Sequence, residues 1–177
     1  MKQESLGKNL RRIVLFVKEE LLKRSESESI IKPAPDRWSP KEIIGHLIDS
    51  ASNNHQRFVR AQFKEDMIFQ GYAQDEWVIV QAYQKRSWEE LVELWAQFNL
   101  QIAHVMDSCS EEIRLKERGK HNFHQIAFKR VSETEPTSLQ YFMVDYISHL
   151  EHHILSILPA YVAQTEAYQN DFHILKT

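Results

Sequence analysis

The sequence predicts an all-α protein, specifically a four-helix bundle with long connections between helices two and three and between helices three and four. Glycine and proline are scarce, at 4 and 5 of 177 residues. The usual glycine frequency of about 7% would give roughly a dozen, so turn-rich sandwiches and barrels are disfavoured. Four stretches carry apolar residues at helical spacing, and three of them follow a capping signal. The length fits one domain over residues 1–177.

The first two helices are predicted in the N-terminal third of the chain. Helical spacing of apolar residues from Leu10 to Leu21 indicates a helix that ends near Ser25. The second helix begins at Ser39-Pro40-Lys41-Glu42, a capping box with proline at the first helical position. Its apolar stripe consists of Ile44, Leu47, Ile48, Ala51 and Phe58.

Similar signals begin the other two helices. Ser87-Trp88-Glu89-Glu90 precedes an apolar stripe that runs to Cys109, and Thr137-Ser138-Leu139-Gln140 is a threonine and glutamine version of the same box. Pro159 is expected to end or kink the last helix. The connection over residues 66–86 is expected to contain a short helix with Trp77 and Tyr83, and the connection over 111–135 is expected to be partly extended around His124 to Val131. Long connections in a bundle often build or cover a site.

Composition excludes several classes of function. Lysine and arginine total 22 against 25 acidic residues, a net charge of -3. The surface therefore offers no basic footprint for nucleic acid or anionic lipid. No segment approaches the ~20 apolar residues of a membrane span, and we expect a cytoplasmic protein. The single cysteine, Cys109, excludes an intrachain disulfide and a thiolate metal cluster.

Two histidines of the last helix are candidate metal ligands. His149 and His153 are four residues apart, so they lie one turn apart and both project into the apolar stripe. Imidazoles at this spacing bind one metal ion at ~2.0–2.1 Å. The alternative is that both rings hydrogen-bond to buried polar groups. Glu151, between them, is expected to face solvent.

The other histidines are harder to assign. Periodicity places His46 opposite the apolar stripe of the second helix, which predicts a surface residue, whereas His55 lies on the stripe and is the better third ligand by this criterion. The rest are expected to be exposed or incidental: His104 on a solvent face, His121 and His124 on a solvated connection, His152 beside the stripe, and His173 in a tail.

Four segments resemble the DinB-like family, also called the YfiT-like metalloenzymes. They are WSPKEIIGHLIDSASNNHQRFVRAQ (Trp38 to Gln62), GYAQDEWV (Gly71 to Val78), SWEELVELWAQFNLQIAHVM (Ser87 to Met106) and DYISHLEHHILSIL (Asp145 to Leu158). The most specific feature is G-H-L after W-S-x-x-E together with the late H-x-x-x-H. The resemblance covers most of the chain from Trp38 onward.

The resemblance implies a four-helix bundle, often a homodimer, with a divalent metal held by His46, His149 and His153. It therefore selects His46 over His55. Zinc and nickel are the expected ions, because imidazole ligands suit both. Some relatives use the metal to activate a low-molecular-weight thiol such as bacillithiol or mycothiol for transfer to an electrophilic substrate. A hydrolase that activates water and a non-catalytic metal-binding module of the stress response are the alternatives.

Three further residues are candidates near this site. Asp145 precedes His149 by four residues, so it is a candidate acceptor for that imidazole, although a surface carboxylate is the simpler interpretation. Asn53 and Arg57, with the neighbouring Asn54, are candidates for substrate binding, and solvated polar residues are again the simpler interpretation.

Overall fold

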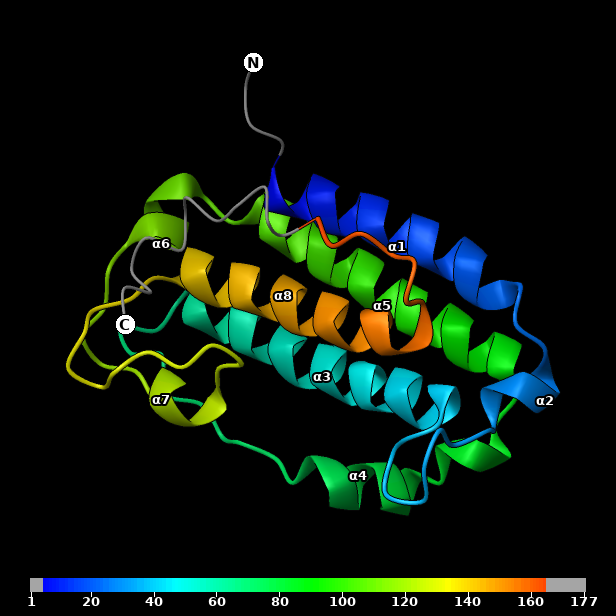
Figure 1. The fold of residues 1–177 in the computed structure, drawn as a ribbon. Coiled ribbons are helices and arrows are strands. Elements are labelled where there is room, and N and C mark those ends of the chain that lie inside the picture. Colours follow the sequence, from blue (N-terminus) through cyan, green and yellow to red (C-terminus); the bar gives the residue numbers. More distant parts are fainter. Residues whose placement is uncertain (1–4, 165–177) are drawn as a thin grey trace.

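The computed structural model describes residues 5–164, and its framework is four long helices (Figure 1). They are α1 (Leu6–Leu22), α3 (Pro40–Ala61), α5 (Trp88–Ser108) and α8 (Leu139–Ile157). Shorter helices lie in the connections: α2 (Glu26–Ser29), α4 (Gln74–Gln81), the 3-10 helix η1 (Tyr83–Lys85), α6 (Glu111–Leu115) and α7 (Phe123–Ile126). No helix among residues 5–164 is long and apolar enough to cross a membrane.

The four long helices pack side by side as a bundle, which confirms the predicted fold class (Figure 1). Helix α1 packs against α5 and α8, and α3 packs against the same two helices. The colours of Figure 1 show that α3 and α5 run in the same direction, because the connection between them crosses the length of the bundle beneath α3. This connection carries α4 and η1, which cover a second side of α3.

The capping signals locate the helix starts to within one residue. Ser39 accepts from the Glu42 N–H while Glu42 bonds back to the Ser39 N–H, as the capping box predicts. Ser87 accepts from the Glu90 N–H. The last helix starts one residue later than predicted, because Ser138 supplies the capping oxygen in place of Thr137.

The first helix ends at Leu22, three residues before the predicted end. Ser25 instead caps the short helix α2 through a capping box with Glu28. The predicted short helix around Trp77 and Tyr83 is present as α4 and η1. The predicted extended segment from His124 to Val131 is wrong at its start, because residues 123–126 form helix α7, whereas Ala127 directly after it is extended.

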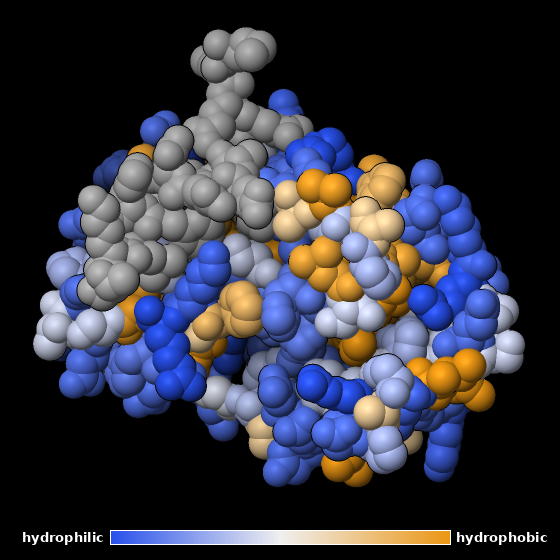
Figure 2. All heavy atoms as spheres, in the orientation of Figure 1, coloured by the Kyte–Doolittle hydropathy of each residue, from blue (hydrophilic) through white to orange (hydrophobic). Residues whose placement is uncertain are grey.

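The core is formed by the apolar stripes of all four long helices together with buried residues of the connections, among them Met67, Phe69 and Phe123. Hydrophilic residues cover much of the face drawn in Figure 2, and the hydrophobic residues there lie in separate groups. One close approach fixes η1 against α3: a Cβ at Gly45 would collide with the Tyr83 ring. The Tyr83 hydroxyl donates to Asp49, one turn further along α3, at 2.6 Å. Glycine at position 45 therefore lets the crossover connection pack directly beside His46.

Candidate metal centre and cavity

Three imidazole rings converge between α3 and α8. His46 Nε2 lies 3.3 Å from His149 Nε2, and His153 Nε2 lies 3.1 Å from the same atom. One nitrogen from each ring lies within 4.8 Å of the other two. In the described part of the chain, this is the one group of three or more metal-binding side chains that is close enough to share an ion.

The spacing of these nitrogens fits a tetrahedral metal site. Two imidazole nitrogens bound at ~2.0–2.1 Å with a tetrahedral angle between them are about 3.3 Å apart. Both measured Nε2 separations agree with this value. In the absence of an ion, each imidazole nitrogen carries either one proton or one lone pair in the plane of its ring, so it makes one hydrogen bond. A hydrogen bond between two of the three nitrogens therefore leaves the third without a partner in the cluster. The donor set therefore fits a divalent ion better than a purely hydrogen-bonded cluster.

Burial keeps these rings neutral. It lowers the pKa of His46 from 6.5 to about 4. It also lowers the pKa of His153 to about 3, helped by the neighbouring His46 and His152. The pKa of His149 falls well below 6.5 for the same reason, with added repulsion from His153 and His46. At neutral pH all three rings therefore carry a lone pair available to a metal.

His46 is buried, with 1% of its surface exposed, so the surface position predicted from periodicity is wrong. The periodicity assumed one solvated face for its helix. In the structure α5, α8, α4 and η1 all contact α3, which buries polar residues on the side away from the apolar stripe. Trp38 packs on the His46 ring at 4.9 Å between ring centroids and on the His153 ring at 6.3 Å. Trp38 is the first residue of the W-S-x-x-E motif but was not among the site residues predicted from the sequence.

Among the remaining histidines, His152 contacts the His153 ring at 5.3 Å between ring centroids but is not a member of the group of three. His55 is half-buried and is not part of the group, and His104 is exposed as predicted. The prediction of a solvated position for His121 is wrong, because it is 6% exposed and its Nε2 is 2.8 Å from the Glu135 carbonyl. His124 is half-buried in α7 and lies near Glu133. His173 lies outside the described residues.

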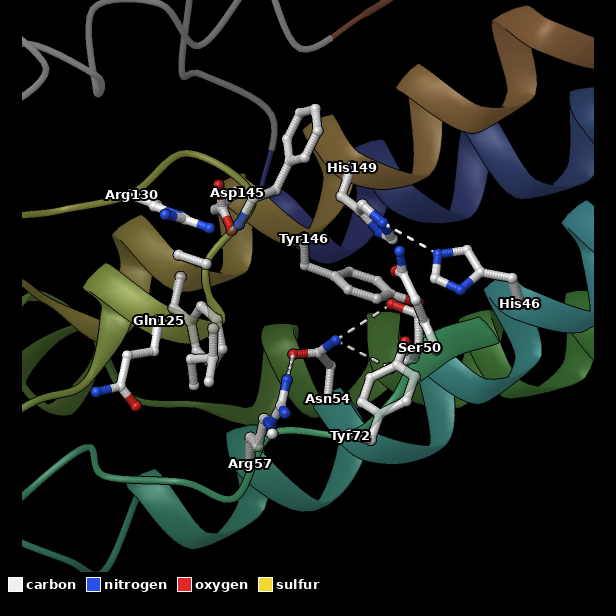
Figure 3. A pocket seen from close by; sticks show the side chains of 16 residues that line it. His46, Ser50, Asn54, Arg57, Tyr72, Gln125, Arg130, Asp145, Tyr146 and His149 are labelled. Atoms are coloured by element: carbon white, nitrogen blue, oxygen red, sulfur yellow. Dashed lines mark hydrogen bonds between the residues drawn. The ribbon is translucent and has the colours of Figure 1, made fainter. Parts of the chain in front are cut away.

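A cavity of about 330 Å³ opens beside His46 and His149 (Figure 3). Its wall is mostly polar and comes from α3, α8, the start of the crossover connection and the segment around α7. The labelled lining residues are His46, Ser50, Asn54, Arg57, Tyr72, Gln125, Arg130, Asp145, Tyr146 and His149. The first four lie at intervals of three or four residues, so one face of α3 carries them from the histidine cluster to the far end of the cavity.

A second cavity, of about 800 Å³, borders the cluster at His153. Its wall includes His153 and Trp38 together with the loop over residues 31–37, and it shares no lining residue with the first cavity. His46 and His149 therefore border one cavity and His153 borders the other.

Asp145 contacts the cluster through a neighbouring loop. Its carboxylate is 2% exposed, which corrects the simpler interpretation of a surface residue. Its two oxygens accept from the backbone N–H groups of Phe128 and Lys129 at 2.9 and 2.7 Å. The Phe128 ring in turn contacts the His149 ring at 5.4 Å. Burial raises the pKa of Asp145 to about 6 against the effect of these backbone bonds.

The two candidate substrate-binding residues differ in position. Arg57 lines the first cavity and is 6% exposed. Asn53 does not line that cavity, and its amide nitrogen donates to the Asp49 carbonyl of its own helix. Asn54 lines the cavity and accepts from Arg57 at 3.3 Å. Of the adjacent asparagines, Asn54 is therefore the one that faces the site.

The sequence profile of the DinB superfamily matches residues 16–157, which include all three histidines. The chain belongs to the DinB superfamily. This family assignment agrees with the resemblance that the four sequence segments indicate. No curated protein sequence matches the chain.

The DinB fold of this chain is also found in a solved structure. YfiT from Bacillus subtilis superposes with a TM-score of 0.71 and 15% sequence identity, over 90% of this chain and 89% of YfiT. That protein is described as a probable metal-dependent hydrolase with an unusual four-helix bundle topology. At this identity the likeness establishes the shared fold of the two chains.

Proposed function

We propose that this DinB-superfamily protein is a divalent-metal-dependent enzyme whose ion is held by His46, His149 and His153. The observation that carries the proposal is the convergence of three neutral imidazole nitrogens beside a polar cavity, with His149 Nε2 at tetrahedral separations from the other two. Zinc and nickel both suit an all-imidazole set. Three protein ligands leave a position for a reacting molecule, as catalytic sites require.

The proposed reaction is transfer of a low-molecular-weight thiol, of the bacillithiol type, to an electrophilic substrate. When bound, the ion would lower the pKa of a coordinated thiol, so that the thiolate is available as a nucleophile at neutral pH. Two cavities border the cluster, and a transfer reaction needs room for two organic molecules. This arrangement favours transfer over hydrolysis, which needs one organic substrate and water.

The chain's own residues position and shield the centre. Trp38 covers His46 and His153 on the side of the second cavity, which fixes both rings. Asp145 holds the loop that places Phe128 against His149. Supporting residues of this kind commonly set ligand orientation and metal affinity.

Hydrolysis is the second candidate, supported by the description of YfiT, which shares the fold. A non-catalytic metal-binding module is less well supported. Such a module is expected to close the coordination sphere with a fourth side chain. Neither His55 nor His124, the two nearest candidates by sequence, belongs to the group of three among the described residues.

The test is an activity assay on the zinc- or nickel-loaded protein. Conjugation of bacillithiol or mycothiol to 1-chloro-2,4-dinitrobenzene is measured beside hydrolysis of a p-nitrophenyl ester. We expect metal-dependent conjugation that is lost in His46→Ala and retained in His55→Ala, the matched control on the same helix. Ester hydrolysis without conjugation supports the hydrolase, and equal rates with and without metal contradict the proposal.

A further inference from the structure

Arg57 is a buried cation at the far end of the first cavity. Its guanidinium donates to the Asn54 side-chain oxygen at 3.3 Å and to the Gln70 carbonyl at 2.7 Å. Both acceptors are uncharged. No ion pair involves Arg57 among residues 5–164, so the charge of this 6% exposed side chain has no carboxylate beside it there.

An uncompensated buried charge is costly and indicates a binding role. Burial lowers the pKa of Arg57 from 12.5, in keeping with this cost, but the guanidinium stays charged at neutral pH. A protein retains such a group where a ligand of opposite charge completes the site. Three of its five N–H groups are not engaged by the two hydrogen bonds.

The rest of the cavity wall also favours an anion. Arg130 adds a second cation from the opposite side (Figure 3). Asp145 is the one carboxylate among the lining residues, and both of its oxygens already accept backbone N–H groups. Ser50, Asn54 and Tyr72 provide neutral polar groups between Arg57 and the histidines.

The position of Arg57 sets the shape of the ligand. His46 and Arg57 are eleven residues apart on α3, which is about 16 Å along the helix axis. The anionic group of a ligand at Arg57 is therefore separated by several bonds from the atom that reaches the histidines. A single buried guanidinium matches the charge and fork geometry of one carboxylate.

We propose that the first cavity binds a substrate with a carboxylate several bonds from its reactive group, and that Arg57 is the residue that recognises this carboxylate. The inference rests on the proposed function for the reactive end of the substrate. The recognition of the carboxylate is inferred from the cavity and its charges alone. Carboxylate binding and metal binding are therefore tested in separate experiments.

The first experiment uses cobalt-loaded protein and two probes of the same length, 6-mercaptohexanoate and its methyl ester. Binding is followed by the visible absorption of cobalt and by calorimetry. We expect the acid to bind about tenfold more tightly than the ester, because a charge-assisted hydrogen bond pair contributes at least that ratio. Arg57→Gln removes the preference and Arg57→Lys restores part of it. Arg60→Gln, an exposed arginine one turn further on α3, leaves it unchanged.

The second experiment separates failure of this inference from failure of the metal site. Adipate and the uncharged adipamide are titrated into chelator-treated wild-type protein. Adipate binding that depends on Arg57 supports the inference even if no metal binds. Equal binding of the acid and ester probes by wild-type protein overturns the inference, and this result does not depend on whether Arg57→Gln folds. The proposed metal site is unaffected by that outcome.

Discussion

His46 makes the stability of the metal-free protein depend on pH. Its pKa is lowered by burial from 6.5 to about 4. As pH falls from 7 to 5, the unfolded chain takes up about 0.7 proton at this residue, whereas the ring in the folded protein stays mostly neutral. The unfolded state thus binds more protons, so stability is fully present above pH 6.5 and is lost as pH falls toward 4. For these two pKa values the loss between pH 7 and pH 5 is about 2 kcal/mol.

The assay is urea unfolding of chelator-treated wild-type protein and of His46→Gln at pH 7 and pH 5. Comparing the two proteins cancels the titration of groups that do not contact His46, such as Asp145, whose raised pKa works in the opposite direction. We expect the variant to gain about 2 kcal/mol relative to wild type on going from pH 7 to pH 5. Parallel pH curves for the two proteins refute the account of His46 as a buried, neutral ring.

Two further predictions concern the helix that carries His46. Gly45→Ala is expected to destabilise the fold by about 1–3 kcal/mol in urea unfolding, because the new methyl group collides with Tyr83. The control is Gly119→Ala, whose methyl group meets nothing within 4 Å and is expected to leave urea unfolding almost unchanged. A Gly45→Ala protein as stable as wild type would show that Tyr83 does not pack there. Ser39→Ala is expected to cost about 1 kcal/mol in the same measurement, and Ser39→Gly only a few tenths. Equal losses in the two Ser39 variants argue against the capping role.

The helices were predictable because their signals are local. The box at Ser39 places a helix start without knowledge of the tertiary structure, and the apolar stripes identify the buried faces. At the last helix the box at Thr137 and the observed cap at Ser138 differ by one residue, because adjacent hydroxyl residues both offer a capping oxygen. Local sequence cannot choose between them.

The site was harder to predict because it depends on distant segments. Periodicity selected His149 and His153, but it misplaced His46 because the crossover connection covers the side of α3 that the pattern assigned to solvent. Glu151 is misplaced for a similar reason: Tyr161 and the backbone of Gln164 donate to its carboxylate, so a segment after the helix buries it. The family resemblance supplied His46, which periodicity could not.

Metal content tests the central claim most directly. Elemental analysis of the purified protein, after saturation with zinc or nickel and removal of the excess, gives the number of ions per chain. We predict one ion per chain in wild-type protein, none in His149→Ala, and one in His104→Ala, whose histidine is exposed and is not a member of the group. Wild-type protein that retains no ion, or His149→Ala with unchanged stoichiometry, would contradict the three-histidine centre.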